Sequence, residues 1–131
     1  MPHELIMIVD DNPANLKLAE VVLSVAGFKI LTAVNAEQAL QNIVKFRPRL
    51  ILMDIQLPGI DGLECTRIIK SDPVTKDIIV VALTSYAMKG DEEKALRAGC
   101  NGYLTKPIDT RTLAEIVEGY LRRGSNAGSA G

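Results

Sequence analysis

Five side chains that could do chemistry follow the short apolar runs of this 131-residue chain. Asp10 and Asp11 come directly after the first run, Asp54 follows another, and Thr84 and Lys106 follow two more. If these runs are neighbouring strands, the three carboxylates converge, and protonation or cations must relieve their repulsion. Oxygen ligands without a nearby His or Cys favour Mg²⁺, which keeps several of its waters in protein sites. The residue types therefore indicate a magnesium site with room for a phosphate.

Asp54 is the natural nucleophile of this set, because an ionised carboxylate beside Mg²⁺ and an ammonium can attack phosphorus in line. It stands alone after its run, whereas Asp10 and Asp11 form a pair better suited to holding a metal. The Thr84 hydroxyl and the Lys106 ammonium can each bind a phosphoryl oxygen. Singly, each residue has a plainer explanation, since Asp and Thr cap helices and most Lys side chains are solvated. Their joint placement is what indicates phosphoryl transfer.

Short strands must position these residues. Three nearly unbroken apolar runs are typical of strands that are covered on both faces, as in a parallel sheet. Two further runs are more mixed or shorter, and they indicate edge strands. The five predicted strands span residues 5–9, 29–34, 50–53, 78–83 and 102–105.

Helical segments with recognisable ends lie between the predicted strands. The first has Pro13 in its first turn and stops at Gly27, and the second opens with Asn35 and Gln38 in capping-box spacing. Strict alternation of strand and helix predicts an α/β fold with an open, doubly wound parallel sheet, whose sites form beyond the carboxyl ends of the strands. The five predicted helices span about 13–26, 35–47, 63–70, 91–98 and 110–122.

Composition predicts one domain with a limited set of partners. A hydrophobic content of 47% fits a compact domain at residues 4–122, followed at 124–131 by a flexible tail or an appended sequence rich in Gly, Ser and Ala. The net charge of -1 argues against nucleic acid or an anionic membrane as a direct partner. The longest apolar run is too short to span a bilayer, so we expect a cytosolic protein. Cys65 and Cys100 are expected to be buried free thiols.

Four separated motifs carry a family resemblance. The segments IVDDN, LILMDIQLPGIDG, VALTS and YLTKP, taken with their order, resemble response-regulator receiver domains of the CheY-like superfamily. The segment AMKGDEEKALRAGC further resembles single-domain receivers of the DivK type and receivers carried by hybrid histidine kinases, between which the sequence does not choose. The resemblance implies a flavodoxin-like (βα)5 fold with strand order 2-1-3-4-5.

The resemblance also implies the roles of the acidic residues. Asp54 would be the phospho-acceptor of a two-component phosphorelay, taking its phosphoryl group from a phosphohistidine in a Mg²⁺-dependent reaction. Asp11 and Asp54 would bind Mg²⁺ directly, together with the backbone carbonyl of Gln56, and Asp10 would support the metal closely. Phosphoryl transfer would be self-catalysed and followed by slow autodephosphorylation, with no enzymatic activity on other substrates. By resemblance, Gln56 and Tyr86 would regulate the attack of water on the acyl-phosphate.

A switch is implied by the same resemblance. Thr84 and Lys106 would contact the phosphoryl group, and Thr84 would move toward it while Tyr103 turns inward. Spacing alone favours a simpler role for Tyr103, as an edge-strand aromatic that only packs. The peptide before Pro107 is cis in relatives, although sequence alone leaves trans as the default.

Two surfaces are expected to receive partners. A histidine kinase or a histidine phosphotransfer protein would dock on the start of the first helix, at Ala14, Asn15 and Leu18, and on the loop at Pro107 and Ile108. A downstream protein target would bind the face built from the fourth helix, fifth strand and fifth helix. The first helix also carries a second apolar stripe, which is either covered by a partner or simply part of a widely buried helix. That stripe consists of Leu18, Val21, Val22 and Val25.

Three other functions compete with this one. An aspartate-nucleophile phosphohydrolase usually has a second acid two residues after the nucleophile, where this chain has Gln56, and it needs a cap domain to enclose its substrate. A nucleotide-binding protein would show a GxGxxG or GxxxxGK[ST] segment after the first strand, and neither is present. A degenerate receiver would lack one of the acids, the Thr or the Lys, and this sequence keeps them all.

Overall fold

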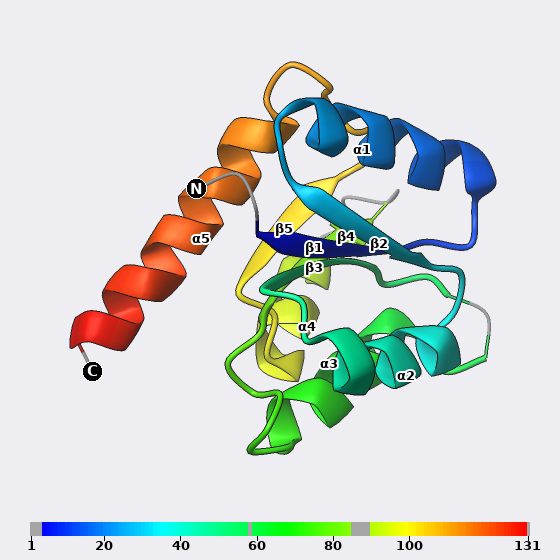
Figure 1. Ribbon diagram of the computed structural model, residues 1–131. Coiled ribbons are helices and arrows are strands. Elements are labelled where there is room, and N and C mark those ends of the chain that lie inside the picture. Colours follow the sequence, from blue (N-terminus) through cyan, green and yellow to red (C-terminus); the bar gives the residue numbers. More distant parts are fainter. Residues whose placement is uncertain (1–3, 58, 85–89, 131) are drawn as a thin grey trace.

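The computed structural model describes residues 4–57, 59–84 and 90–130, which form one five-stranded parallel sheet with helices on both faces (Figure 1). The strand order is β2-β1-β3-β4-β5, which confirms the predicted doubly wound α/β fold. The strands are β1 (Leu5–Val9), β2 (Lys29–Ala33), β3 (Leu50–Asp54), β4 (Ile79–Thr84) and β5 (Gly102–Thr105). The helices are α1 (Pro13–Val25), α2 (Ala36–Phe46), α3 (Gly62–Ser71), α4 (Asp91–Ala98) and α5 (Leu113–Ala130).

Two hydrophobic cores lie on the two faces of the sheet. Alternate residues of β1, β3 and β4 point to opposite faces, so each of these strands contributes to both cores. α1 and α5 cover one face, and α2, α3 and α4 cover the other (Figure 1). Every residue of β3 and β4 is buried, whereas β2 and β5 are partly exposed at the edges of the sheet. This contrast explains why the unbroken apolar runs belong to the central strands.

Asn side chains start the first two helices. Asn12 accepts hydrogen bonds from the backbone N–H groups of Ala14 and Asn15 at the start of α1. Asn35 accepts one from the Gln38 N–H at 2.8 Å, which confirms the predicted N-terminus of α2. The Gln38 side chain bonds back to the N–H of Val34, one residue earlier than an ideal capping box.

The predicted bounds of α5 were wrong at both ends. The helix begins at Leu113, because the backbone carbonyl of Asp109 accepts from Thr112 and Leu113 in a preceding turn. Its backbone continues to Ala130, past the predicted end near Arg122, since extending a formed helix costs less than starting one. The division into a domain at 4–122 and a separate tail stays a prediction.

Candidate functional site

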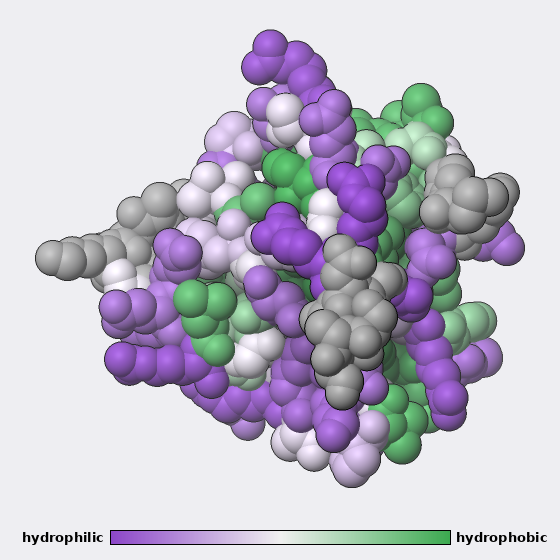
Figure 2. Space-filling view, turned by 90° about the vertical axis from the view of Figure 1, so that its left-hand side faces the viewer, coloured by the Kyte–Doolittle hydropathy of each residue, from purple (hydrophilic) through white to green (hydrophobic). Residues whose placement is uncertain are grey.

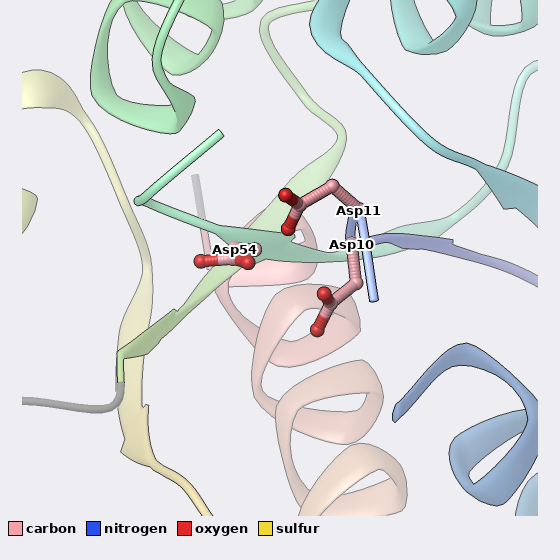
Figure 3. Close-up of side chains that lie close together, drawn as sticks. All are labelled: Asp10, Asp11 and Asp54. Atoms are coloured by element: carbon pink, nitrogen blue, oxygen red, sulfur yellow. The ribbon is translucent and has the colours of Figure 1, made fainter. Parts of the chain in front are cut away.

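Three carboxylates meet beyond the carboxyl ends of two adjacent strands (Figure 3). Asp10 and Asp11 directly follow β1, and Asp54 is the last residue of β3, which pairs with β1 in parallel. One oxygen from each carboxylate lies within 4.8 Å of those of the other two. Asp10 and Asp54 are only 1% and 3% exposed, whereas Asp11 is exposed. The sheet therefore brings together the acids that the sequence singled out.

Lys106 joins this cluster from the loop after β5. Its ammonium Nζ donates to Oδ2 of Asp10 at 2.7 Å and to Oδ2 of Asp54 at 3.2 Å. The Lys106 backbone N–H also donates to the carbonyl of Thr84 at 2.7 Å, which ties the loop to the end of β4. The peptide bond between Lys106 and Pro107 is cis, as in the relatives that the motif resembles. One cation thus bridges two buried carboxylates.

Backbone donors orient the two buried carboxylates. Oδ1 of Asp54 accepts from the N–H of Gln56 at 2.9 Å, and Oδ1 of Asp10 accepts from the N–H of Asn12 at 2.9 Å. Both bonds span two residues, so the turn after each strand holds the side chain that precedes it. Each carboxylate keeps its other oxygen on Lys106.

Burial and charge shift the pKa values of both partners upward. Burial is the main reason that the pKa of Asp54 lies above its usual 3.8, and the Asp10 carboxylate adds to it, while the Gln56 N–H and Lys106 act in the opposite direction. Burial alone would lower the pKa of Lys106, but its hydrogen bond to Asp10 and the charges of Asp54 and Asp10 outweigh that effect and raise it. The site therefore keeps Lys106 charged. Its single positive charge does not balance three ionised carboxylates, and a divalent cation would relieve the repulsion that remains among them.

Thr84 and Tyr103 lie on the strands next to the acids. Thr84 ends β4 and is fully buried, and its neighbour in the strand, Leu83, pairs with Asp54 of β3. Tyr103 of β5 is partly buried and packs against the core on the side of α2, α3 and α4. This position agrees with the packing role that spacing favours, and the switch role stays a prediction. Tyr86 lies outside the described residues, and the Gln56 side chain is exposed.

Gly62 is a site residue that the sequence reasoning missed. A Cβ atom at this position would overlap the backbone carbonyl of Asp54 and crowd Ile55. Only glycine lets the first turn of α3 approach the acid so closely. The signal in the sequence was the Asp61–Gly62 pair, in which Asp61 also caps α3 by accepting from Glu64.

The residues expected to dock a kinase lie near this site. Leu18 of α1 is 41% exposed and Ala14 is exposed, whereas Asn15 is partly buried. Pro107 and Ile108 line a cavity of about 240 Å³ beside the end of β5. Their docking role stays a prediction.

The second apolar stripe of α1 is partly buried and partly exposed. Val22 packs against the core beneath α1 and α5, while Leu18, Val21 and Val25 remain exposed. Both cysteines are buried and free, as predicted.

Comparison with known proteins agrees with this geometry. The family profile of the response regulator receiver domain matches residues 6–118. The chain belongs to this family. The receiver domain is 42% identical over 116 residues to the polar-differentiation response regulator DivK of Brucella anthropi, a match that covers 88% of this chain and 94% of that protein. DivK of Brucella ovis is 40% identical over the same length.

Solved structures place the receiver domain in the same fold. The receiver of a sensor histidine kinase from Pseudomonas aeruginosa PAO1 superposes with a TM-score of 0.83 at 34% identity, covering 91% of this chain and 98% of that chain. That structure has a magnesium ion coordinated in its active-site cleft. A CheY-like receiver from Methanospirillum hungatei JF-1 gives a TM-score of 0.88 at 27% identity, covering 95% and 98%.

This receiver domain therefore acts in two-component phosphorelay signalling, as its family does. Its relatives include both DivK proteins and a kinase-borne receiver, the two kinds that the sequence resembles. In the part of the chain that the structure describes, no helix has the length and apolarity to cross a membrane.

Proposed function

We propose that Asp54 accepts a phosphoryl group from a phosphohistidine in a Mg²⁺-dependent reaction. The observation that carries the proposal is the bridging of buried Asp54 and Asp10 by the Lys106 ammonium. In a phosphoryl transfer, this ammonium can pass from the carboxylates to a phosphoryl oxygen without leaving the site. A surface carboxylate would have no such arrangement.

The donor set fits Mg²⁺ at the three acids. Asp10, Asp11 and Asp54 offer only oxygen atoms, which lie within 4.8 Å of one another. Lys106 supplies one positive charge against three carboxylates, so a divalent cation would complete the neutralisation. We assign Asp11, Asp54 and the Gln56 carbonyl as direct ligands, with Asp10 supporting them. Bound Mg²⁺ would supply positive charge to the phosphoryl oxygens.

The residues of the chain can carry the transfer in one step. A carboxylate oxygen of Asp54 forms a bond to phosphorus as the phosphorus–nitrogen bond of the phosphohistidine breaks, and the imidazole keeps the electron pair. Lys106 then pairs with one phosphoryl oxygen and the Thr84 hydroxyl donates to another. The Gln56 N–H holds Asp54 in place while it attacks.

The phosphorylated state would change the surface that meets partners. Thr84 moves toward the phosphoryl group, Tyr103 turns inward, and the face of α4, β5 and α5 offers a different shape to a downstream protein. A histidine kinase or phosphotransfer protein delivers the group over α1 and the loop at Pro107 and Ile108. The domain works in the cytosol without binding nucleic acid. Its only catalysis is on itself, including a slow return to the unphosphorylated form that Gln56 regulates.

Intact mass spectrometry with acetyl phosphate tests the acceptor directly. With Mg²⁺, the protein is expected to gain one phosphoryl group, and it should gain none with EDTA. Asp54→Asn should gain none under either condition. Asp72→Asn is the matched control, because this exposed acid lies at the far end of α3 and its carboxylate accepts a local bond from the Val74 N–H, which an Asn side chain can also accept. Phosphorylation of Asp54→Asn at the level of the control would overturn the assignment.

A further inference from the structure

The turn between β1 and α1 connects the carboxylate cluster to a helix. Its residues are Asp10, Asp11 and Asn12, and it lies where the strands end. Figure 2 looks onto the opposite side of the molecule, where the strands begin and hydrophobic areas lie among hydrophilic residues. Asp10 and Asp11 belong to the cluster, whereas Asn12 is an exposed amide beside it. The role of Asn12 is therefore separate from that of the acids.

Asn12 forms hydrogen bonds in two directions. Its backbone N–H donates to Oδ1 of Asp10 at 2.9 Å, on the side of the site. Its side-chain Oδ1 accepts from the N–H of Ala14 at 2.9 Å and from the N–H of Asn15 at 3.2 Å, in the first turn of α1. The residue that orients a carboxylate of the site is thus also the residue that caps the helix.

The cap holds the backbone of Asn12 in one conformation. Its φ of -93° and ψ of 114° are those of extended chain, which an N-cap residue adopts just before the helical residues. Its carbonyl accepts from the N–H of Leu16 at 3.1 Å, and the Leu16 side chain is buried in the core beneath α1. Because the side-chain cap ties Asn12 to an anchored helix, its own N–H keeps a fixed direction toward Asp10.

Asp10 depends on this N–H because its carboxylate is buried. Water cannot easily replace a hydrogen bond that such a group loses. The two carboxylate oxygens have different donors, since Oδ1 accepts from Asn12 and Oδ2 accepts from Lys106 at 2.7 Å. Without the Asn12 N–H, the carboxylate would be held at one oxygen only, by a lysine that Asp54 shares.

Asp11 lies between two fixed points of the chain. On one side, the N–H of Asp10 donates to the carbonyl of Ala33 at 3.1 Å. On the other side, Asn12 is held by its cap. Asp11 itself is exposed, so the position of its carboxylate depends on the backbone of this turn. Groups of a binding site work only when they are held to within about 0.5 Å, so a loose turn would weaken the contribution of Asp11 to a metal site.

We propose that Asn12 is a positioning residue for Mg²⁺ binding, because its side-chain cap holds the turn that presents Asp10 and Asp11. The inference rests on the proposed function, since it takes Mg²⁺ to bind at the three acids. Asn12 acts through these carboxylates and is not itself assigned as a ligand. Groups that orient metal ligands directly affect metal affinity by about 10–100-fold. The Asn12 side chain acts one bond further away, so its effect should be smaller.

Titration of the unphosphorylated protein with MgCl₂ at constant ionic strength tests the proposal. Amide chemical shifts measured by NMR give the dissociation constant without any phosphoryl transfer. Asn12→Ala removes the side-chain acceptor but keeps the backbone N–H, and it should raise the Mg²⁺ dissociation constant by about fivefold. Asn12→Ser keeps an oxygen that can cap the helix, so its dissociation constant should stay within about twofold of the parent value.

Asn35 supplies a matched control on another helix. It caps α2 in the same way, because its Oδ1 accepts from the N–H of Gln38 at 2.8 Å, and it lies outside the carboxylate cluster. Urea unfolding should show similar losses of stability in Asn35→Ala and Asn12→Ala, since each loses one cap. The Mg²⁺ dissociation constant of Asn35→Ala should nevertheless change by less than about twofold, because its cap holds no residue of the site.

Three results would overturn the proposal. The first is a parent-like Mg²⁺ affinity in Asn12→Ala, which would leave Asn12 as a helix cap alone. The second is an equal loss of affinity in Asn12→Ala and Asn35→Ala, which would show that affinity follows stability. The third is a failure of Asn12→Ser to restore affinity, which would mean that the cap is not the cause. A parent protein that binds no Mg²⁺ would instead overturn the metal site of the proposed function, and this inference with it.

Discussion

Lys106 lies where the strands of the sheet end, Lys70 lies where they begin, and the two side chains bind different partners. Lys106 donates to two carboxylates, those of Asp10 and Asp54. Lys70 donates to two backbone carbonyls and to the amide oxygen of Asn101. Burial lowers the pKa of both lysines, but the carboxylates reverse the effect at Lys106 and raise its pKa, whereas the pKa of Lys70 stays below its usual 10.5.

The difference separates a reactive role from a structural one. A lysine that pairs with carboxylates can exchange one anionic partner for another. Lys106 can therefore move its ion pair from a carboxylate to a phosphoryl oxygen. A lysine held by neutral oxygens has no such exchange available, and it serves to tie loops together. Both have several hydrogen bonds, so the charge of the acceptors, not the number of bonds, distinguishes the two edges.

Replacement of each lysine by methionine should produce the largest contrast in phosphorylation. Lys106→Met is expected to lower the rate of phosphorylation from acetyl phosphate by roughly 100-fold or more, because it removes a cation from the transferring group. Lys70→Met should stay within about twofold of the parent, since its ammonium lies at the other edge. The measurement is the time course of intact mass at saturating Mg²⁺. Similar losses in the two variants would remove the functional distinction between the edges.

The free energies of unfolding of the two methionine variants should also differ, but by less than their phosphorylation rates. Without Mg²⁺, Lys106→Met is expected to lower the free energy of unfolding by about 3 kcal/mol, because it leaves buried carboxylates uncompensated. Lys70→Met should lower it by about 1–2 kcal/mol, the cost of leaving neutral acceptors without their donor. Urea unfolding at neutral pH gives both values.

Asp54→Asn supplies the control for this stability test. In the Lys106→Met background it should recover part of the lost stability, because it removes one of the repelling charges. In the Lys70→Met background the same change should have the effect that it has in the parent protein. Recovery in both backgrounds would mean that Asp54 and Lys106 are not coupled.

The smallest expected effect is a pair of opposite slopes of stability with pH. Lys106 has a pKa raised above 10.5, so its stabilisation is complete below pH 10.5 and is lost as the pH rises through its folded-state pKa. Lys70 has a pKa lowered from 10.5, so its charged form costs stability, and this cost disappears as the pH rises from its folded-state pKa to 10.5.

Urea unfolding on both sides of pH 10.5 measures these slopes. The rise below this pH should be smaller in Lys70→Met, and the fall above it should be smaller in Lys106→Met. The comparison fails if each variant keeps the slope assigned to its missing lysine.

Most of the fold could be predicted because its signals are local. The buried runs of β3 and β4, the Asn35 cap and the alternation of strand and helix all lie within short stretches of chain. The carboxyl ends of parallel strands also lie on the same side of a sheet, so the sequence was enough to predict that Asp10, Asp11 and Asp54 lie close together. The end of α5 was missed because Gly and Ser disfavour a new helix more strongly than they stop an existing one.

The amino-acid sequence by itself determined the order of the elements, the family and the set of chemical groups at the carboxyl edge. Only the tertiary structure decided which oxygens Lys106 bridges, because Asp10 and Lys106 lie 96 residues apart and meet through the register of the sheet. The same reason holds at the other edge. Lys70 looks like an ordinary surface cation in the sequence, and its three acceptors come together only where the beginnings of β4 and β5 lie side by side.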